Sequence, residues 1–293
     1  MQRVITLLIG LAMTAGGYAA RTAGDSKAEQ LLTQARAALG GEKNLTNVRG
    51  LTATGTYQRT MQDRQLAGEM TIDLQLPDKL LRTESMSPMG DMTIITGQGI
   101  NGEQLLRSQR TLNAPPGMIV RMGQPPAGEA ELQAVRNARA DLARTALAFL
   151  LTPPASLPLE FTADGEAESD EGKADVLEAK GVGNFAARIL LDQKSHRPLM
   201  LMYRGVAPRV MIQQQGQGPE GGRGRAETPH DVPSPPASQV VDIVLYLDDY
   251  RPVDGVMLPH RWARSIDGQP NEEMIFKTIR INPVFKPDTF AVK

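Results

Sequence analysis

Alternation between apolar and polar residues over positions 66–76 is the feature that most constrains the fold of this chain. The apolar residues of this stretch are Leu66, Met70, Ile72, Leu74 and Leu76. The intervening Thr71, Asp73 and Gln75 are polar. Successive side chains of a strand point to opposite faces of its sheet. The segment therefore predicts a strand with one buried and one wet face, which is typical of antiparallel sheets.

A period of two recurs along most of the chain. It predicts strands at 48–60, 66–76, 79–86, 91–96, 103–107, 157–162, 174–181, 185–192, 199–203, 240–248, 255–266 and 272–281. Turn sequences join neighbouring strands, as at Asn101-Gly102 and at 267–271. Short strands joined by hairpin turns predict a meander of about ten to twelve strands.

Two segments have a helical period instead. Residues 26–39 begin with Ser26 and Glu29 at the spacing of a capping box, and Gly40-Gly41 follows them. Residues 129–151 carry a stripe of apolar residues and end at Pro153-Pro154. Each helix has one apolar face that needs a surface to cover, so the fold class is α+β.

The first residues predict a signal peptide. Arg3 is followed by an apolar run over 4–15 and by the small-x-small sequence Gly17-Tyr18-Ala19. We expect residues 1–19 to be removed by cleavage after about Ala19, which makes the protein exported and periplasmic. The alternative is a retained anchor helix, but the run is shorter than the roughly 20 residues that a spanning helix needs.

Composition excludes several classes of protein. The chain has no cysteine, which excludes disulfides, thiolate metal sites and a lipid-modified cysteine after the signal. The formal net charge is -1, from 32 basic and 33 acidic residues, and so gives no field that would attract nucleic acid. Residues 207–238 are rich in Gly, Arg and Pro, and we expect a disordered insertion there. The remainder of 20–293 is expected to form a single domain.

Catalytic patterns are missing from the sequence. His196, His230 and His260 are far apart and lack metal-ligand spacing. No serine stands in a Gly-x-Ser-x-Gly elbow, and no cysteine is available as a nucleophile. We therefore predict no catalytic residues, no metal and no cofactor, and a protein that is not an enzyme.

Methionines gather in and beside the predicted strands. They are Met70, Met86, Met89, Met92, Met200, Met202, Met257 and Met274. Flexible, polarisable methionines suit a surface that accepts varied apolar ligands, and they also fill gaps in ordinary cores. Periodicity does not separate a hollow interior from a filled one, so both interpretations stay open.

Both ends of the expected domain resemble a known family. Residues 35–41 (ARAALGG) and 51–56 (LTATGT) are similar to the opening helix and first strand of the outer-membrane lipoprotein-sorting (LolA/LolB-like) superfamily of bacterial envelope proteins. Residues 250–260 (YRPVDGVMLPH), 282–283 (NP) and 288–290 (DTF) resemble its closing segment. The resemblance implies a strongly curved antiparallel half-barrel with helices packed on its concave face.

In that family the concave face holds acyl chains, so the resemblance implies a periplasmic carrier or binding protein for a lipid-like hydrophobic ligand, in lipoprotein or lipid trafficking. The expected cavity lining consists of apolar strand residues: Met70, Ile72, Leu74, Met92, Ile94, Leu258 and Trp262. The partners expected are a lipid or acyl chain, an envelope protein and, transiently, a membrane. The alternative is a non-catalytic envelope scaffold or assembly partner with a filled core. The family's cargo-releasing arginine has no clear counterpart here, and the 207–238 insertion is foreign to its pattern.

Overall fold

The computed structural model describes residues 21–61, 64–89, 91–115, 127–170, 172–206 and 240–291. Its helices are α1 (Arg21–Ala38), α2 (Glu42–Thr46) and α3 (Glu129–Leu150), with a short 3-10 turn at Val182–Asn184. The first five strands are β1 (Gly50–Met61), β2 (Arg64–Gln75), β3 (Lys79–Met89), β4 (Met92–Asn101) and β5 (Gln104–Leu112). The other seven are β6 (Leu159–Ser169), β7 (Gly172–Gly181), β8 (Phe185–Asp192), β9 (Pro198–Val206), β10 (Val240–Val253), β11 (Val256–Ile266) and β12 (Gln269–Ile281).

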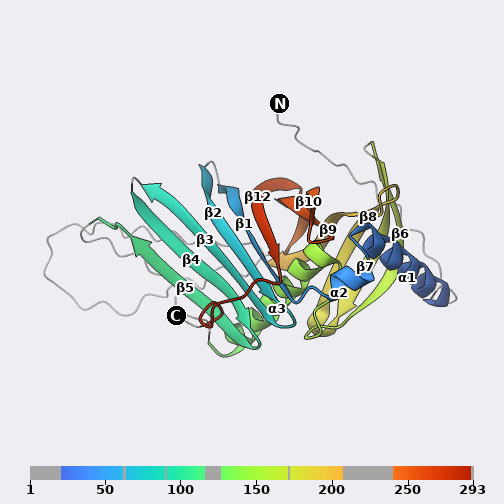
Figure 1. Cartoon of the computed structure of the whole chain (residues 1–293), viewed down its shortest axis with the longest axis horizontal. Coiled ribbons are helices and arrows are strands. Elements are labelled where there is room, and N and C mark those ends of the chain that lie inside the picture. The colour runs from blue at the N-terminus through green and yellow to red at the C-terminus, as the bar shows by residue number, and fades with distance from the viewer. Residues whose placement is uncertain are drawn as a thin grey trace, which may run out of the picture.

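All twelve strands form one antiparallel sheet, in the order β5-β4-β3-β2-β1-β12-β11-β10-β9-β8-β7-β6 (Figure 1). Consecutive strands pair as two meanders, β1 to β5 and β6 to β12. The two meanders meet where β1 pairs with β12, with Leu51 opposite Ile281 and Arg59 opposite Glu272. Strand order, which the sequence left open, is thus set by one pairing between distant parts of the chain.

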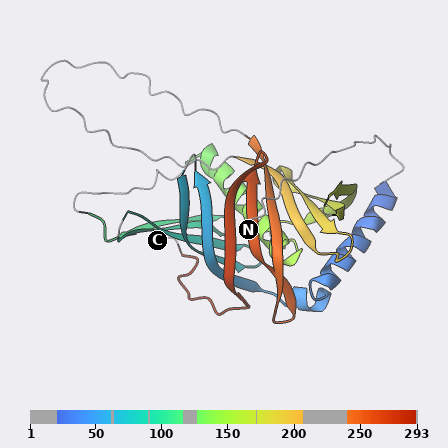
Figure 2. The same ribbon diagram turned by 90° about the horizontal axis from the view of Figure 1, so that it is seen from above.

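The sheet is strongly curved, and α3 lies inside the curve (Figure 2). It contacts strands from both meanders, including β4, β5, β9 and β11. Helix α1 packs on β6 and β7, and Lys27 of α1 lies 3.5 Å from Asp175 on the inner face of β7. The predicted fold class, a curved antiparallel half-barrel with helices on its concave face, is confirmed.

The main core lies between the sheet and its helices. Inward residues of the strands pack against the second half of α3, where Leu142, Ala146, Leu147 and Leu150 are almost completely buried. Phe149 of α3 lies against Trp262 and Phe276, with ring centroids 4.4 Å and 5.5 Å away. Offset and edge-to-face aromatic pairs of this kind add about 0.5–1.5 kcal/mol to the burial of their area. Helix α3 is therefore held mainly by its C-terminal half.

Several sequence predictions need correction: one helix cap and the ends of several strands, including β6, which runs to Ser169, and β10, which runs to Val253, beyond the predicted 157–162 and 240–248. Ser26 is not the helix cap, because α1 already begins at Arg21. Strands β4 and β5 run to Asn101 and Leu112, well beyond the predicted 91–96 and 103–107. Gly99 does not end β4. It lies inside the strand, at a position where a Cβ would clash with the carbonyl oxygen of Leu80 on β3.

Some predictions fall outside the described residues. These are the signal peptide at 1–19 with its cleavage after Ala19, His230 and the whole insertion at 207–238. Among the helices of the described ranges, none is both long and apolar enough to cross a membrane.

Candidate functional site

The seven predicted lining residues all lie on the inner face of the sheet. Met70, Ile72 and Leu74 of β2 and Leu258 and Trp262 of β11 belong to one core cluster together with α3. Met92 and Ile94 lie on the same face of β4. Ile94 pairs with Met86 of β3, Met86 pairs with Gly68 of β2, and Gly68 pairs with Tyr57 of β1, so Ile94 shares the face of Tyr57. The structure thus brings them onto one surface, much of which α3 covers. Their role as ligand lining stays a prediction.

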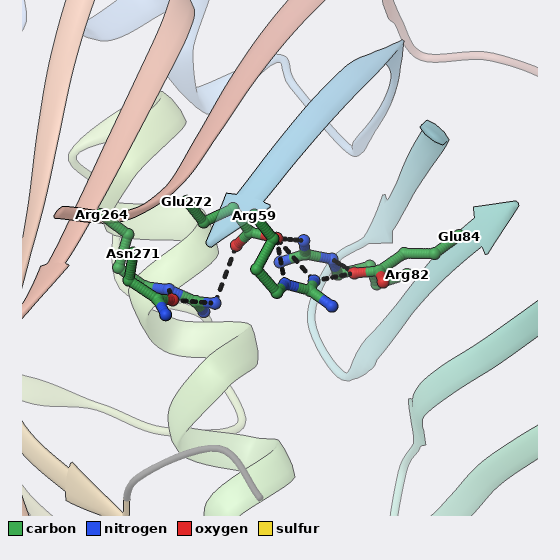
Figure 3. Close-up of polar contacts among 6 residues, drawn as sticks. All are labelled: Arg59, Arg82, Glu84, Arg264, Asn271 and Glu272. Carbon is green, nitrogen blue, oxygen red and sulfur yellow. Dashed lines mark hydrogen bonds and ion pairs between the residues drawn. The ribbon is translucent and has the colours of Figure 1, made fainter. Parts of the chain in front are cut away.

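A buried cluster of charges lies on the same face, and sequence reasoning missed it. We call it the arginine cluster: Arg59, Arg82 and Arg264 with Glu84 and Glu272 (Figure 3). The Glu272 carboxylate is at its centre. Its Oε1 accepts hydrogen bonds from Arg59 Nε at 2.9 Å and from Arg82 Nη2 at 2.8 Å. Its Oε2 lies 2.8 Å from Arg264 Nη2.

A second carboxylate bridges two of these arginines. Glu84 Oε1 accepts a hydrogen bond from Arg59 Nη2 at 2.7 Å and lies 2.7 Å from Arg82 Nε. The side chain of Glu272 has no exposed surface, and the exposed fractions of the Glu84, Arg59 and Arg82 side chains are 12%, 16% and 26%. Solvent access therefore increases from Glu272 toward Arg82.

Two β-bulges place these side chains. Between β11 and β12 the pairing steps from Arg264–Glu272 to Ser265–Pro270, so Asn271 is an extra residue. Asn271 Oδ1 consequently accepts hydrogen bonds from Arg264 Nε and Nη2, at 3.2 Å and 3.1 Å. Between β12 and β1 the pairing steps from Thr278–Thr54 to Phe276–Gly55, so Lys277 is the extra residue. Bulges re-aim side chains in this way next to functional sites.

Electrostatics keep the central carboxylate ionised. Burial by itself would raise the pKa of Glu272, but Arg82, Arg264 and Arg59 more than compensate and hold that pKa below its ordinary value. Burial lowers the pKa of Arg264, and Glu272 opposes this shift. Burial also raises the pKa of the neighbouring Tyr57 hydroxyl, an effect to which Glu84 adds. Glu272 is thus an ionised carboxylate inside the fold.

Helix α3, which packs against the inner face of the sheet, contributes a further arginine. Arg144 stacks on Tyr203 of β9, with 4.0 Å from its guanidinium carbon to the ring centroid, and its Nη1 lies 2.9 Å from Asp141 Oδ1. Burial raises the pKa of Tyr203, while Arg144, Arg264 and Arg82 lower it. Tyr203 therefore lies within electrostatic reach of both α3 and the arginine cluster.

Metal-ligating side chains are not gathered anywhere in the described ranges, where no group of three or more His, Cys, Asp or Glu could hold an ion. His260 is buried on β11, and its Nδ1 lies 3.0 Å from the carbonyl oxygen of Leu258. His196 sits in the turn after β8 with a positive φ of 58°. The two histidines are thus held separately, each by local backbone contacts.

An open groove of about 640 Å³ lies on the outer face, between the sheet and the C-terminal segment. Its floor is Thr52 and Thr54 of β1 with Thr71 and Asp73 of β2, and its wall includes Phe285. Thr52 Oγ1 donates a 2.6 Å hydrogen bond to Asp73, and burial raises the pKa of that carboxyl. This groove has a mixed polar and apolar lining and faces away from the predicted ligand lining.

The sequence did contain a signal for the arginine cluster. Arg82 and Glu84 have the same parity in their strand as Leu80, whose side chain lies in the core. Paired charges at inward positions of a strand are uncommon, because long charged side chains are seldom buried unless they are paired. The alternation of residues within single strands, however, does not predict that β1 pairs with β12.

Comparisons with known proteins were made with the sequence and with the fold. No family model matches the sequence, and no curated protein matches it. The fold is similar to a LolA superfamily protein of Nitrosomonas europaea, with 10% identity, 91% of this chain and 97% of that chain covered, and a TM-score of 0.46. It is also similar to an outer membrane lipoprotein-sorting protein domain of Vibrio parahaemolyticus (10% identity, 91% and 97% covered, TM-score 0.44) and to a DUF1329 family protein of Desulfovibrio piger (8% identity, 90% and 96% covered, TM-score 0.44). The names of the first two agree with the resemblance predicted from the ends of the chain.

Proposed function

We propose that this protein is a non-catalytic carrier or binding protein for a lipid-like hydrophobic ligand in the bacterial cell envelope. The ligand is bound by the inner face of the sheet, along Met70, Ile72, Leu74, Met92, Ile94, Leu258 and Trp262. Export belongs to the same proposal, with residues 1–19 removed as a signal peptide and residues 20–293 forming the binding domain.

The observation that supports this proposal is that α3 covers much of the inner face of the sheet. A curved sheet of twelve strands presents most of its buried apolar residues inward, and α3 lies inside the curve against strands of both meanders. The N-terminal half of α3 is largely exposed, whereas its last ten residues make most of its buried contacts. Movement of this one helix would uncover a continuous apolar surface on both meanders.

An acyl chain offers the same kind of surface as α3. Burial of hydrocarbon contributes about 0.8 kcal/mol per CH₂ group, so a long chain replaces the contacts of a few leucines. Methionines at Met70, Met92 and Met274 suit such an exchange because their side chains adapt to different neighbours. We therefore expect ligand binding and displacement of α3 to be coupled.

Native mass spectrometry of the protein purified from the periplasm, with solvent extraction of bound lipid, tests the proposal. We expect an adduct that disappears after extraction, and a chain that begins near Ala20. Protein refolded from denaturant without lipid is the control and should regain the adduct when membrane lipid is added. Repeated isolation of ligand-free protein that takes up no lipid would contradict the carrier function.

A second candidate, an envelope scaffold or assembly partner, is favoured by a different observation. Six of the seven predicted lining residues are already buried, five of them in the main core cluster. The sheet also ends in two edge strands, β5 and β6, whose outer backbone groups could pair with another chain. Cross-linking in cells distinguishes this candidate, because a scaffold yields a defined partner and a carrier retains lipid without one.

A further inference from the structure

We propose that the arginine cluster binds the anionic group, a carboxylate or a phosphate, at the head of the hydrophobic ligand. This inference rests on the proposed carrier function and names the chemical class of its ligand. The apolar inner face holds the hydrocarbon part, and Arg59, Arg82 and Arg264 receive the charge.

Stability does not explain the arginine cluster. Removing ionised groups from water costs several kcal/mol each, and replacement of a buried ionic network by packed apolar residues is often neutral or stabilising. Here three guanidiniums surround only two carboxylates, which leaves an excess of one positive charge on a largely buried surface. An excess of buried positive charge is an arrangement that a bound anion would neutralise.

Hydrogen-bond donors are also in excess on this face. Among the described residues, four buried donor atoms in and around the cluster lack a hydrogen-bond partner, namely the Tyr57 hydroxyl, Arg82 Nε, Arg144 Nε and Trp262 Nε1, against one acceptor atom, Glu272 Oε2. Arg82 Nε is close to Glu84 but poorly aligned with it. Arginine and the tryptophan ring nitrogen have no acceptor capacity, so their complement is an acceptor-rich group. Carboxylate and phosphate oxygens are such groups, and buried donors without partners call for an explanation of this kind.

The order of residues along the strands matches an amphiphile. On the inner face of β12, Glu272 is followed by Met274 and then by Phe276. Met274 lies between Tyr57 of β1 and Trp262 of β11, one inward position away from the arginine cluster. Inward positions are spaced by about 6.8 Å along a strand. A headgroup at Arg82 therefore leaves its chain directly over the apolar part of the same strands.

Trp262 is the single tryptophan of the chain and lies beside the arginine cluster, which makes it a built-in probe. Dibrominated stearate and the matching dibrominated stearyl alcohol quench tryptophan fluorescence on contact and differ only in the charge of the headgroup. We expect the acid to bind about tenfold more tightly than the alcohol, which is the effect of one charge-assisted hydrogen bond. Brominated lysophosphatidic acid, tested in parallel, shows whether phosphate is preferred to carboxylate.

Two variants test the role of the arginine cluster. Arg82→Gln should remove the preference for the acid and leave binding of the alcohol unchanged. Arg261→Gln is the matched control, because Arg261 of β11 pairs with Glu273 of β12 and Asp248 of β10 on the outer face of the sheet. Glu84→Gln removes a competing carboxylate and should tighten binding of the acid several-fold, whereas a purely structural cluster would be weakened by this change.

The outcomes separate the inference from the function on which it rests. If neither the acid nor the alcohol quenches Trp262, the carrier function itself is wrong. If both bind equally and neither Arg82→Gln nor Glu84→Gln changes their ratio, the ligand is hydrophobic but the headgroup site is not the arginine cluster. If Arg82→Gln fails to fold, the Glu84→Gln result alone decides, since tighter binding of the acid supports the inference and unchanged or weaker binding refutes it.

Discussion

Glu272 and Glu273 are adjacent on β12, and each pairs with an arginine of β11 on opposite faces of the sheet. We predict that Glu272→Gln destabilises the protein far more than Glu273→Gln. The two substitutions make the same chemical change one residue apart, so strand position, backbone and β propensity are matched. What differs is the environment of the carboxylate.

The expected magnitudes follow from that environment. The Glu272 side chain is fully buried and is the only group of the arginine cluster that contacts all three guanidiniums. Its neutralisation leaves buried positive charges uncompensated, which costs about 3–5 kcal/mol. The Glu273 and Arg261 side chains are 32% and 33% exposed, and pairs with this access to solvent contribute about 0–1 kcal/mol.

Urea unfolding followed by Trp262 fluorescence measures both losses at neutral pH. Because the pKa of folded Glu272 lies below its ordinary value of 4.5, the stability that it contributes is present above 4.5 and is lost as the pH falls through the folded value. The difference between wild type and Glu272→Gln should therefore shrink on acidification. Equal losses in the two variants, or a difference that does not depend on pH, would refute the account of the arginine cluster.

Three further predictions concern the core, the helix and the strand ends. Phe149→Ala removes the centre of the aromatic contacts and should cost about 3–5 kcal/mol in urea unfolding, against almost nothing for the exposed Leu132→Ala. Cysteines at Arg139 and Glu103, whose side chains are 2.9 Å apart, would let a cleavable bismaleimide fix α3 to the β4–β5 turn; lipid uptake should stop and return after cleavage. Asn282→Ala removes hydrogen bonds to the backbone at Arg49, Gly50 and Asn47 and should lower the unfolding midpoint by the equivalent of about 1–2 kcal/mol.

Elements with an uninterrupted pattern could be predicted from the sequence. The helix expected at 129–151 is α3, and the strand expected at 185–192 is β8. In both segments the spacing of the apolar residues fits a single type of secondary structure. Each segment is followed by prolines or by charged turn residues. The prediction of strand ends failed where a residue is required by its contact with a neighbouring strand. The strand predicted at 91–96 ended just before Gly97, but Gly97 and Gly99 lie inside β4, where they allow close approach to Ser108 of β5 and Leu80 of β3.

The arginine cluster could not be predicted as a whole, because its central contacts join distant parts of the chain: Glu272 lies 213 residues from Arg59 and 190 residues from Arg82. Arg59 and Glu272 meet only after β12 has joined β1, and Arg82 of β3 reaches Glu272 across β2 and β1. Apart from Arg82 and Glu84, whose parity with Leu80 places them inward, each residue on its own resembles a solvated strand charge. By contrast, the apolar lining could be assigned to one face, since alternation within each strand is enough to do so.

The two bulges of β12 explain why charge and apolar surface lie side by side. A strand that slipped by one residue would bring Glu273 inward and turn Glu272, Met274 and Phe276 to the outer face. The extra residues Asn271 and Lys277 enclose this five-residue stretch on both sides and so define its register against β1 and β11. Asn271 is in addition a ligand of Arg264, so the bulge that sets the register also holds part of the arginine cluster. The two bulges therefore position both the headgroup site and the hydrocarbon surface. A substitution at either bulge should disturb both of them.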